Sequence, residues 1–398
     1  MLTRRGRFIF ALGFGVYLAA WAFGSRPLYP VATGLLLVVL VAWAWVRLAD
    51  RRFDVQRGSG DREHVEGDDV PVVVELRPTG KVLPAAVTLK ERVGPLGEQR
   101  HLLRRSGRRL SVRYVLEHVP RGRYAFEDVR AELSDPFALE RAVVPLPAPG
   151  ALLVYPRLVQ LGSLFSESGA ASHDGRRVLL RRHTGFELHG VREYEQGESL
   201  RRVHWPSTAR RGQLMVKELQ DSPRDEVAVV LDADARAVVG ESFEVQVRAV
   251  GSLVDAYVRR GRRAVLVVNS ERRELQHVHS GAADWRRALE LLAAVEPSGE
   301  VPLSRLLAEE DGPAARALEL VVVTARIDAA LVDRLVQRSL SRRKVSLVYV
   351  DPASFNGVAR KPEPGLLRLH AAGVAVAVVR DGDDLATRLQ GSLEAAHA

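Results

Sequence analysis

Two apolar runs at the start of the chain place the strongest constraint on its fold. The first covers Phe8 to Gly24, the second covers Leu28 to Ala49, and three residues separate them. Each run approaches the roughly 20 residues that a helix needs to cross the hydrocarbon core of a bilayer. A backbone in lipid has to satisfy its own hydrogen bonds, so such runs can only be helices. The sequence therefore predicts a two-helix transmembrane hairpin over residues 1–52.

The distribution of positive charge assigns an orientation to this hairpin. Of the formal charge of +9, residues 1–52 contribute +6, because they hold seven arginines and one aspartate. Arginines that flank membrane spans mark the cytoplasmic side. Three arginines precede the first run and three lie at or beyond the end of the second, against Arg26 alone between the runs. We therefore expect a multi-pass protein of the inner (plasma) membrane with the bulk of the chain in the cytoplasm. The competing interpretation is a cleaved export signal followed by one anchor, which places the bulk outside.

The composition of the rest of the chain excludes several classes of function. The 346 residues after the hairpin sum to only +3, so bulk charge gives no support to nucleic acid as a partner. The chain has no cysteine, which excludes disulfides, zinc–thiolate sites and thiol catalysis. A length of 398 residues favours more than one domain.

Residues 53–150 have the pattern of a β-sandwich-like module. Alternating apolar runs occur at Val70–Leu76, Ala85–Lys90 and Leu110–Leu116, and glycine, proline and aspartate separate them. Short alternating strands bounded by such residues are typical of antiparallel sandwiches. Prolines between positions 145 and 156 then predict a linker over residues 151–182.

The last part of the chain, residues 183–398, alternates buried strands with amphipathic helices. Nearly continuous apolar runs are typical of strands that are buried on both faces. Their alternation with helices predicts an α/β fold with a parallel sheet, in which ligands bind beyond the carboxyl ends of the strands. The runs are Glu226–Leu231, Arg263–Val268, Leu318–Val323, Val345–Val350 and Val374–Val379.

The first of these strands ends at a candidate cation site. Asp232 and Asp234 follow it, and two carboxylates at a strand tip are suitable ligands for Mg²⁺. Arg236, however, places a cation where a third oxygen ligand is needed, and Thr324 rather than a carboxylate ends the third run. The sequence therefore favours Asp232 as a polar loop or helix-cap residue. A degenerate Mg²⁺ site at Asp232 and Asp234 stays as the alternative.

Other catalytic chemistry has little support in the sequence. His183, His189 and His204 have spacings that match no metal-binding template. Ser207 has no nucleophile elbow around it, and no phosphate-binding glycine loop occurs. A hydrolase built on His204, Ser207 and Asp232 is therefore a residual alternative. We predict no enzyme activity and no cofactor.

The segment before the first buried strand holds the most distinctive pattern in the chain. It reads GFELHGVREYEQGESLRRVHWPSTARRGQLMVKE over Gly185–Glu218. It closely resembles the hallmark of bacterial membrane-anchored proteins of domain-of-unknown-function family fifty-eight, with Glu198 where that family usually has aspartate. The matching residues are Phe186, Arg192, Tyr194, Gly197, Arg201, Trp205, Ala209, Arg210 and Lys217.

This resemblance implies a fold and a set of partners. In the family, the hallmark precedes a von Willebrand factor A-like domain and follows a transmembrane hairpin and a β-rich module. The β-rich module ends in a segment that matches Asp135, Pro136 and Phe137 of this chain. The resemblance also implies that the protein functions with a MoxR-type AAA ATPase and a transglutaminase-like membrane protein, in envelope or complex assembly. Well-preserved members keep a D-x-S-x-S metal motif, from which this chain departs at Asp234 and Arg236.

The mixed charges of the hallmark favour a structural joint that doubles as a docking face. Its arginines can pair with neighbouring glutamates, and tryptophan and arginine dominate protein interfaces. We therefore predict a non-enzymatic, membrane-anchored scaffold or protein-interaction module. The alternative is a Mg²⁺-dependent ligand-binding switch at Asp232 and Asp234. The residues predicted to form the joint or the docking face are Arg192, Tyr194, Gly197, Arg201, Trp205, Arg210, Arg211 and Lys217.

Overall fold

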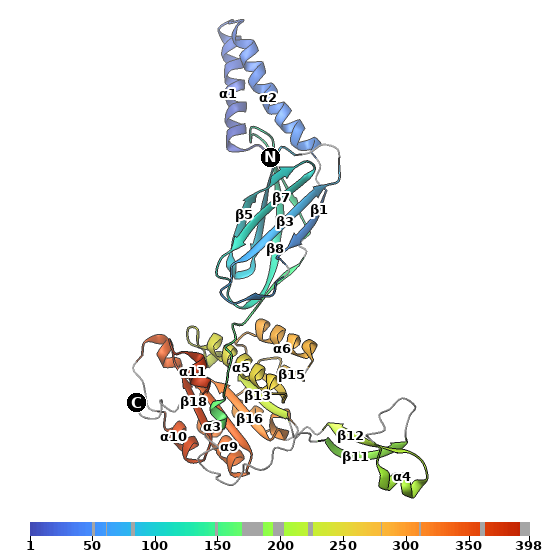
Figure 1. The fold of residues 1–398 in the computed structure, drawn as a ribbon. Helices are drawn as coiled ribbons and strands as arrows, with labels where there is room; N and C mark the ends of the chain where they lie inside the picture. The colour runs from blue at the N-terminus through green and yellow to red at the C-terminus, as the bar shows by residue number, and fades with distance from the viewer. Residues whose placement is uncertain are drawn as a thin grey trace. The chain divides into compact units, whose positions relative to one another are not determined.

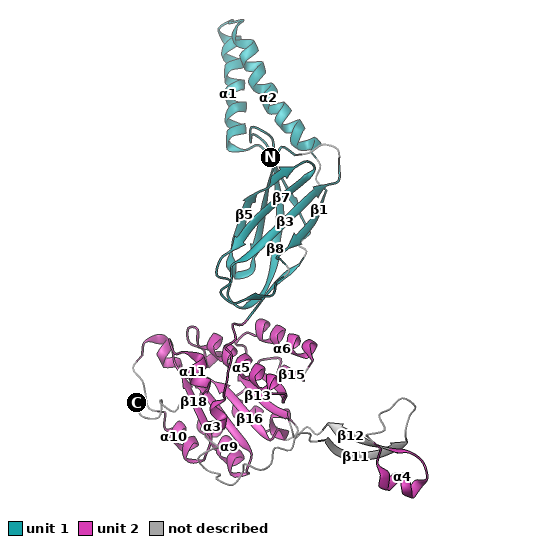
Figure 2. Cartoon of the chain, viewed as in Figure 1, with its two compact units in different colours: residues 1–155 teal, residues 156–398 magenta. Residues whose placement is uncertain are grey.

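The computed structural model divides the chain into two compact units, residues 1–155 and 156–398 (Figure 2). For residues 168, 186–193 and 216–221 only the backbone is described. The described residues are 1–49, 52–60, 62–80, 84–147, 150–168, 186–193, 203–221, 226–279, 281–309, 312–358 and 363–390.

Unit 1 begins with two helices that pack side by side, α1 (Arg4–Ala22) and α2 (Leu28–Leu48) (Figure 1). They approach closely at Gly13, where an added Cβ would lie 3.1 Å from the Cβ of Leu35. Within the described ranges, only α2 is long and apolar enough to cross a membrane. Arginines in the first turns of α1 lower its hydropathy, so the structure supports one of the two predicted spans by this criterion.

The remainder of unit 1 is a sandwich of two sheets. One sheet has the order β1-β3-β7-β6, and the other has β2-β10-β8-β4-β5 with β9 also paired to β8. Alternate side chains of β3 point into a common core that both sheets share. The strands are β1 (Phe53–Gly58), β2 (His64–Val65), β3 (Val70–Pro78), β4 (Ala86–Val93), β5 (Glu98–Leu102), β6 (Arg104–Ser106), β7 (Arg109–Leu116), β8 (Gly122–Ser134), β9 (Arg141–Pro145) and β10 (Ala151–Tyr155).

Strand β10 falls inside the range that the sequence assigned to the linker. It pairs antiparallel with β8 and parallel with β2, and its Leu152 and Val154 are buried in the sandwich core. Residues 151–155 therefore belong to the sheet, and the linker prediction was wrong for them. The pairing partners of β10 lie far away in sequence, so the nearby prolines gave the stronger local signal.

Unit 2 contains a six-stranded sheet with helices on both faces (Figure 1). Its order is β15-β14-β13-β16-β17-β18, and all neighbours are parallel except the antiparallel edge strand β15. The five apolar runs each form a strand, and only β15 was not expected. The strands are β13 (Glu226–Asp232), β14 (Arg263–Asn269), β15 (Leu275–Val278), β16 (Glu319–Thr324), β17 (Lys344–Val350) and β18 (Ala375–Val379).

Two separate apolar cores cover the two faces of this sheet. One forms mainly beneath α5 and α6 and the other beneath α7 to α10, because successive residues of each central strand point to opposite faces. The helices are α3 (Phe165–Ser168), α5 (Ser242–Arg259), α6 (Ala282–Ala294), α7 (Leu303–Leu306), α8 (Pro313–Arg316), α9 (Ala329–Leu340), α10 (Pro364–Ala371) and α11 (Leu385–Gln390).

The strand order fixes where a ligand can bind. From β13 the chain proceeds outward to β14 and β15, and then returns to the other side of β13 as β16. In open α/β sheets such a reversal leaves a crevice at the carboxyl ends of the two strands. The site is therefore expected where β13 and β16 end.

The hallmark segment forms a separate pair of strands and a short helix. Strands β11 (Phe186–Glu193) and β12 (Met215–Asp221) pair antiparallel, with an irregularity between Leu188 and Gly190. Helix α4 (Trp205–Arg211) precedes β12 and ends at Gly212, whose φ of 70° suits glycine.

Candidate functional site

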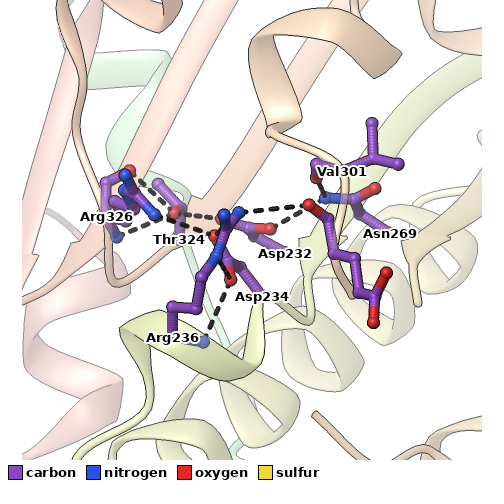
Figure 3. Close-up of polar contacts among 8 residues, drawn as sticks. Asp232, Asp234, Arg236, Asn269, Val301, Thr324 and Arg326 are labelled. Atoms are coloured by element: carbon purple, nitrogen blue, oxygen red, sulfur yellow. Dashed lines mark hydrogen bonds and ion pairs between the residues drawn. The ribbon is translucent and has the colours of Figure 1, made fainter. Parts of the chain in front are cut away.

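The tip of β13 places a buried carboxylate at the reversal point of the sheet. Asp232 is 5% exposed, and both of its carboxylate oxygens accept hydrogen bonds (Figure 3). Asn269 Nδ2 donates to Oδ1 at 3.0 Å, and Thr324 Oγ1 donates to Oδ2 at 2.6 Å. Burial raises the pKa of Asp232, although these two donors act in the opposite direction. The carboxyl group thus joins the tips of β13, β14 and β16.

A second carboxylate, two residues further on, is held by two arginines. The side chain of Asp234 is 3% exposed, and Arg236 forks onto it through Nε at 2.8 Å and Nη2 at 2.9 Å. Arg326 Nη1 reaches the same carboxylate at 3.2 Å from beyond β16 (Figure 3). Burial alone would raise the pKa of Asp234, but the Arg236 hydrogen bonds and the nearby positive charges lower it. Asp234 is therefore an ionised anchor for two cations.

The same aspartate also shapes the loop that carries Arg236. The backbone N–H of Arg236 donates to Asp234 Oδ1 at 3.0 Å, which caps the single-turn 3₁₀ helix η4 (Ala235–Ala237). Arg236 Nη2 further donates to the backbone oxygen of Glu300 at 3.2 Å. Arg236 and Arg326, about half-exposed, thus flank the reversal point from two different loops.

These residues do not fit a Mg²⁺ ion as they are arranged. Mg²⁺ needs several oxygen ligands in a small octahedral set. Both oxygens of Asp234 face guanidinium groups, and those of Asp232 accept from neutral donors. In the part of the chain that the structure describes, no group of three or more histidine, cysteine or acidic side chains could hold a metal. Arg236 and Arg326 supply the positive charge at this position instead.

The sequence identified only part of this cluster. Asp232 and Asp234 were the predicted site residues, and the structure brings Arg236, Thr324 and Arg326, which also follow recognisable strands, into contact with them. Asn269 was missed, although it ends the second apolar run and could have been found by that position.

The predicted docking residues are accessible where the structure describes their side chains. Trp205 is 66% exposed at the start of α4, and Arg210 and Arg211 are exposed in its last turn. Arg192 and Lys217 lie on β11 and β12, where only the backbone is described. The remaining predicted residues, Tyr194, Gly197 and Arg201, lie outside the described residues.

Contacts beneath α4 tie this short helix to the start of β12. The backbone N–H of His204 donates to Met215 O at 2.8 Å, and Met215 N–H donates to Thr208 Oγ1 at 3.0 Å. His204 Nδ1 is 2.8 Å from Ser207 Oγ. Asp232, the third member of the hydrolase alternative, instead bonds to Asn269 and Thr324. Hydrogen bonds to Met215 thus tie the helix to β12, while its tryptophan and arginines are exposed.

The fold and the strand-tip cluster define an α/β protein in which arginine–carboxylate pairs occupy the crevice at the carboxyl ends of β13 and β16. More particularly, the chain belongs to the family described as "Protein of unknown function DUF58", whose model matches residues 190–390. The "Uncharacterized protein YeaD" of Bacillus subtilis (strain 168) is 25% identical over 221 residues. That match covers 55% of this chain and 54% of YeaD, so the chain spans about half the length of this curated relative.

A solved structure, Cwp6 from Clostridium difficile, shows a weaker likeness. It covers 84% of this chain and 51% of that chain at 9% sequence identity, with a TM-score of 0.22. This similarity is too low to bear on the fold or on the function.

Proposed function

We propose that this protein is a non-enzymatic, membrane-anchored scaffold whose cytoplasmic part binds other proteins. The observation that carries the proposal is the exposed surface of α4, which has Trp205 in its first turn and Arg210 and Arg211 in its last turn. Tryptophan and arginine are the residue types most enriched among interface hot spots. Trp205 is two-thirds exposed, and hydrogen bonds to Met215 hold its helix in place, so this side chain is well suited to insert into a partner's pocket.

The anchor in this proposal is the pair α1 and α2, with both helices in the membrane. Helix α2 supports it by its length and apolar composition, and α1 packs along it. Arginines at the start of α1 and Arg47 at the end of α2 lie at the same end of the pair, which favours the cytoplasm for that end. The sandwich of unit 1 and the whole of unit 2 then follow on the cytoplasmic side.

We further propose that unit 2 is von Willebrand factor A-like and works with a MoxR-type AAA ATPase in envelope or complex assembly. The sheet order, with one antiparallel edge strand beside five parallel strands, supports the first point. The family resemblance supports the second, and a transglutaminase-like membrane protein is a further candidate partner. The exposed arginines of α4 predict that the surface they meet is acidic.

The test is direct binding of a purified MoxR-type ATPase to the full chain in nanodiscs, followed by biolayer interferometry. Trp205→Ala combined with Arg210→Ala should weaken binding by about 30-fold or more, as loss of a hot spot does. Leu340→Ala combined with Arg334→Ala is the matched control, because it removes an exposed leucine and an exposed arginine from α9. Equal loss in both variants would refute docking through α4, and no binding by the unaltered chain would refute the ATPase as partner.

The Mg²⁺-dependent switch stays a separate prediction. A buried carboxylate with a raised pKa, Asp232, is the feature in its favour, and the arginines on Asp234 are the feature against it. Because bound ligand stabilises a fold, Mg²⁺ should raise the melting temperature of the unaltered chain if the switch exists.

A further inference from the structure

A groove at the base of the two N-terminal helices has one charged end and one apolar end. The charged end is a pocket of about 850 Å³ that Arg4, Arg7, Arg47 and Arg141 line. The apolar end is a pocket of about 580 Å³ between α1 and α2. The side chains that line both pockets are Leu2 and Trp43, so the two spaces adjoin.

The charged end holds positive charge that nearby acids do not neutralise. Within the described residues, no carboxylate forms an ion pair with Arg4, Arg7 or Arg47. Arg141 pairs with Glu132 at 3.3 Å. The acidic residue of the pocket, Glu140, accepts from the amino group of Met1 at 2.5 Å. Three arginines, two from the start of α1 and one from the end of α2, thus line one pocket without a matching anion.

Arg47 is held in place beside the point where the two pockets adjoin. Its guanidinium lies over the Trp43 ring, 5.4 Å from the ring centroid. Such stacking leaves the edge of the guanidinium free to donate hydrogen bonds to a phosphate or carboxylate. Trp43 therefore contacts both the charged group and the apolar groove that leads away from it.

The apolar end follows the length of the helices. Phe10, Leu36 and Leu40 line it, and its hydroxyl groups come from Tyr17 and Thr33. The Thr33 hydroxyl donates to the Tyr29 backbone oxygen at 2.8 Å, so it needs no partner from a ligand. A hydrocarbon chain fits this lining, whereas a polar molecule would leave its hydrogen bonds unsatisfied.

We propose that this groove binds an anionic phospholipid, with the phosphate at Arg4, Arg7 and Arg47 and an acyl chain between α1 and α2. The proposal rests on the membrane anchoring proposed above. A free phosphate would satisfy the arginines but leave the apolar groove unfilled. A zwitterionic lipid brings a cation together with its phosphate, so it offsets less of the arginines' charge than an anionic lipid does. Basic pockets between helices at the cytoplasmic surface are suited to acidic headgroups.

Native mass spectrometry of the delipidated full chain in detergent, with phosphatidylglycerol as the probe, tests the charged end. Arg7→Gln combined with Arg47→Gln should weaken lipid binding by roughly 10-fold to 30-fold, since each arginine near an anionic lipid contributes about fivefold or slightly less. Arg104→Gln combined with Arg109→Gln removes two exposed arginines from β6 and β7 and should leave binding within about twofold. Unchanged binding in the first variant would overturn the proposal.

A second variant and two other probes test the apolar end and the choice of ligand. Leu40→Trp fills the groove from a position that is already exposed, and it should weaken phosphatidylglycerol binding while the melting temperature is unchanged. Phosphatidylcholine should bind at least tenfold more weakly, and glycerol phosphate should not displace the lipid. Equal binding of the two lipids, or displacement by glycerol phosphate, would overturn the lipid assignment.

A separate experiment on membranes distinguishes failure of the lipid site from failure of the proposed function. Extraction of membranes with alkaline carbonate shows whether the chain is anchored at all. A chain that leaves the membrane refutes the anchor, whereas a chain that stays but binds both lipids equally refutes only the lipid site.

Discussion

At the scale of single residues, Asp234 is the group whose charge organises the strand-tip cluster. Its pKa is lowered, so the stability it contributes is present above its ordinary pKa of about 3.9 and is lost as the pH falls through the folded value. Arg236 contributes the largest part of that stabilisation, but it is half-exposed and Arg326 stays as a second partner. The cost of removing Arg236 should therefore depend on pH.

Arg236→Ala is expected to lower the melting temperature of unit 2 at pH 7, because a buried carboxylate loses a charged hydrogen-bond donor. The difference from the unaltered chain should shrink as the pH falls from the ordinary aspartate pKa of about 3.9 toward the lower folded value of Asp234. Thermal unfolding between pH 3 and 7 measures both effects. Arg236→Lys keeps the charge but loses the fork, so an intermediate result is expected. A loss that is independent of pH would contradict the role given to Asp234.

Removal of both arginines should uncover a cation site that they now occupy. Arg236→Ser with Arg326→Ala leaves Asp232, Asp234 and one new hydroxyl at the tip of β13. Mg²⁺ should then raise the melting temperature of the double variant, by an amount that corresponds to about 2.7 kcal/mol at one hundred times its Kd. The unaltered chain with Mg²⁺ is the control. A rise in the unaltered chain would instead support the Mg²⁺ switch, and no rise in either would show that two carboxylates are insufficient.

At the scale of elements, the loop after β8 limits how deep α2 can lie. The Asp135 carboxylate accepts hydrogen bonds from the backbone N–H groups of Phe137, Leu139 and Glu140, at 2.6–2.8 Å. This fixes Phe137, which is 66% exposed and lines a pocket of about 210 Å³ together with Ala42 of α2. A rigid loop of the sandwich therefore sits beside the second half of the helix.

Because Phe137 and Ala42 line the same pocket, the depth of Ala42 in the bilayer sets the depth of Phe137. Ala42 is six residues from the end of α2, which is about 9 Å along the helix axis. If the hydrocarbon layer ended at Ala42, it would contain only the part of α2 from Leu28 to Ala42, about 21 Å, whereas a bilayer core is roughly 30 Å thick. We therefore expect Phe137 to enter the outer part of the apolar layer.

Because the chain has no cysteine, single-cysteine variants with spin labels can measure this depth. Phe137→Cys should show high accessibility to oxygen and low accessibility to a water-soluble nickel reagent in liposomes. Leu40→Cys in α2 is the positive control, and Leu102→Cys in β5 is the control exposed to water. A Phe137 label that behaves like the Leu102 label would show that α2 does not span the bilayer at the depth inferred here.

Local patterns predicted the buried elements but not those that depend on long-range pairing. The central strands of unit 2 are recognisable because residues buried on both faces must be apolar throughout. Strand β10 pairs with β8 and β2, which lie far away in sequence, so no local period reveals it. Strand β15 pairs with the preceding β14, but its four residues are too few to show a period. The same limit applies to the site. Arg326 reaches Asp234 only because β16 lies beside β13, and strand order cannot be read from apolar runs.

At the scale of the whole molecule, the two interpretations of the N-terminus place unit 2 on opposite sides of the membrane. Arginines at the start of α1 and at the end of α2 favour the cytoplasm for everything after residue 52. A cleaved export signal would instead leave α2 as one anchor and unit 2 outside. Docking with a cytoplasmic ATPase requires the first arrangement, so the proposed function depends on this orientation.

Cysteine labelling in spheroplasts distinguishes the two arrangements. Leu367→Cys, on an exposed position of α10, should react with a membrane-impermeant maleimide only after lysis. Phe23→Cys, in the turn between α1 and α2, should react in intact spheroplasts and is the control for accessible thiols outside. The intact mass of the purified chain should include α1. Labelling of Leu367→Cys before lysis, together with a mass that lacks the first helix, would establish the exported arrangement and remove the cytoplasmic ATPase from the set of partners that unit 2 could reach.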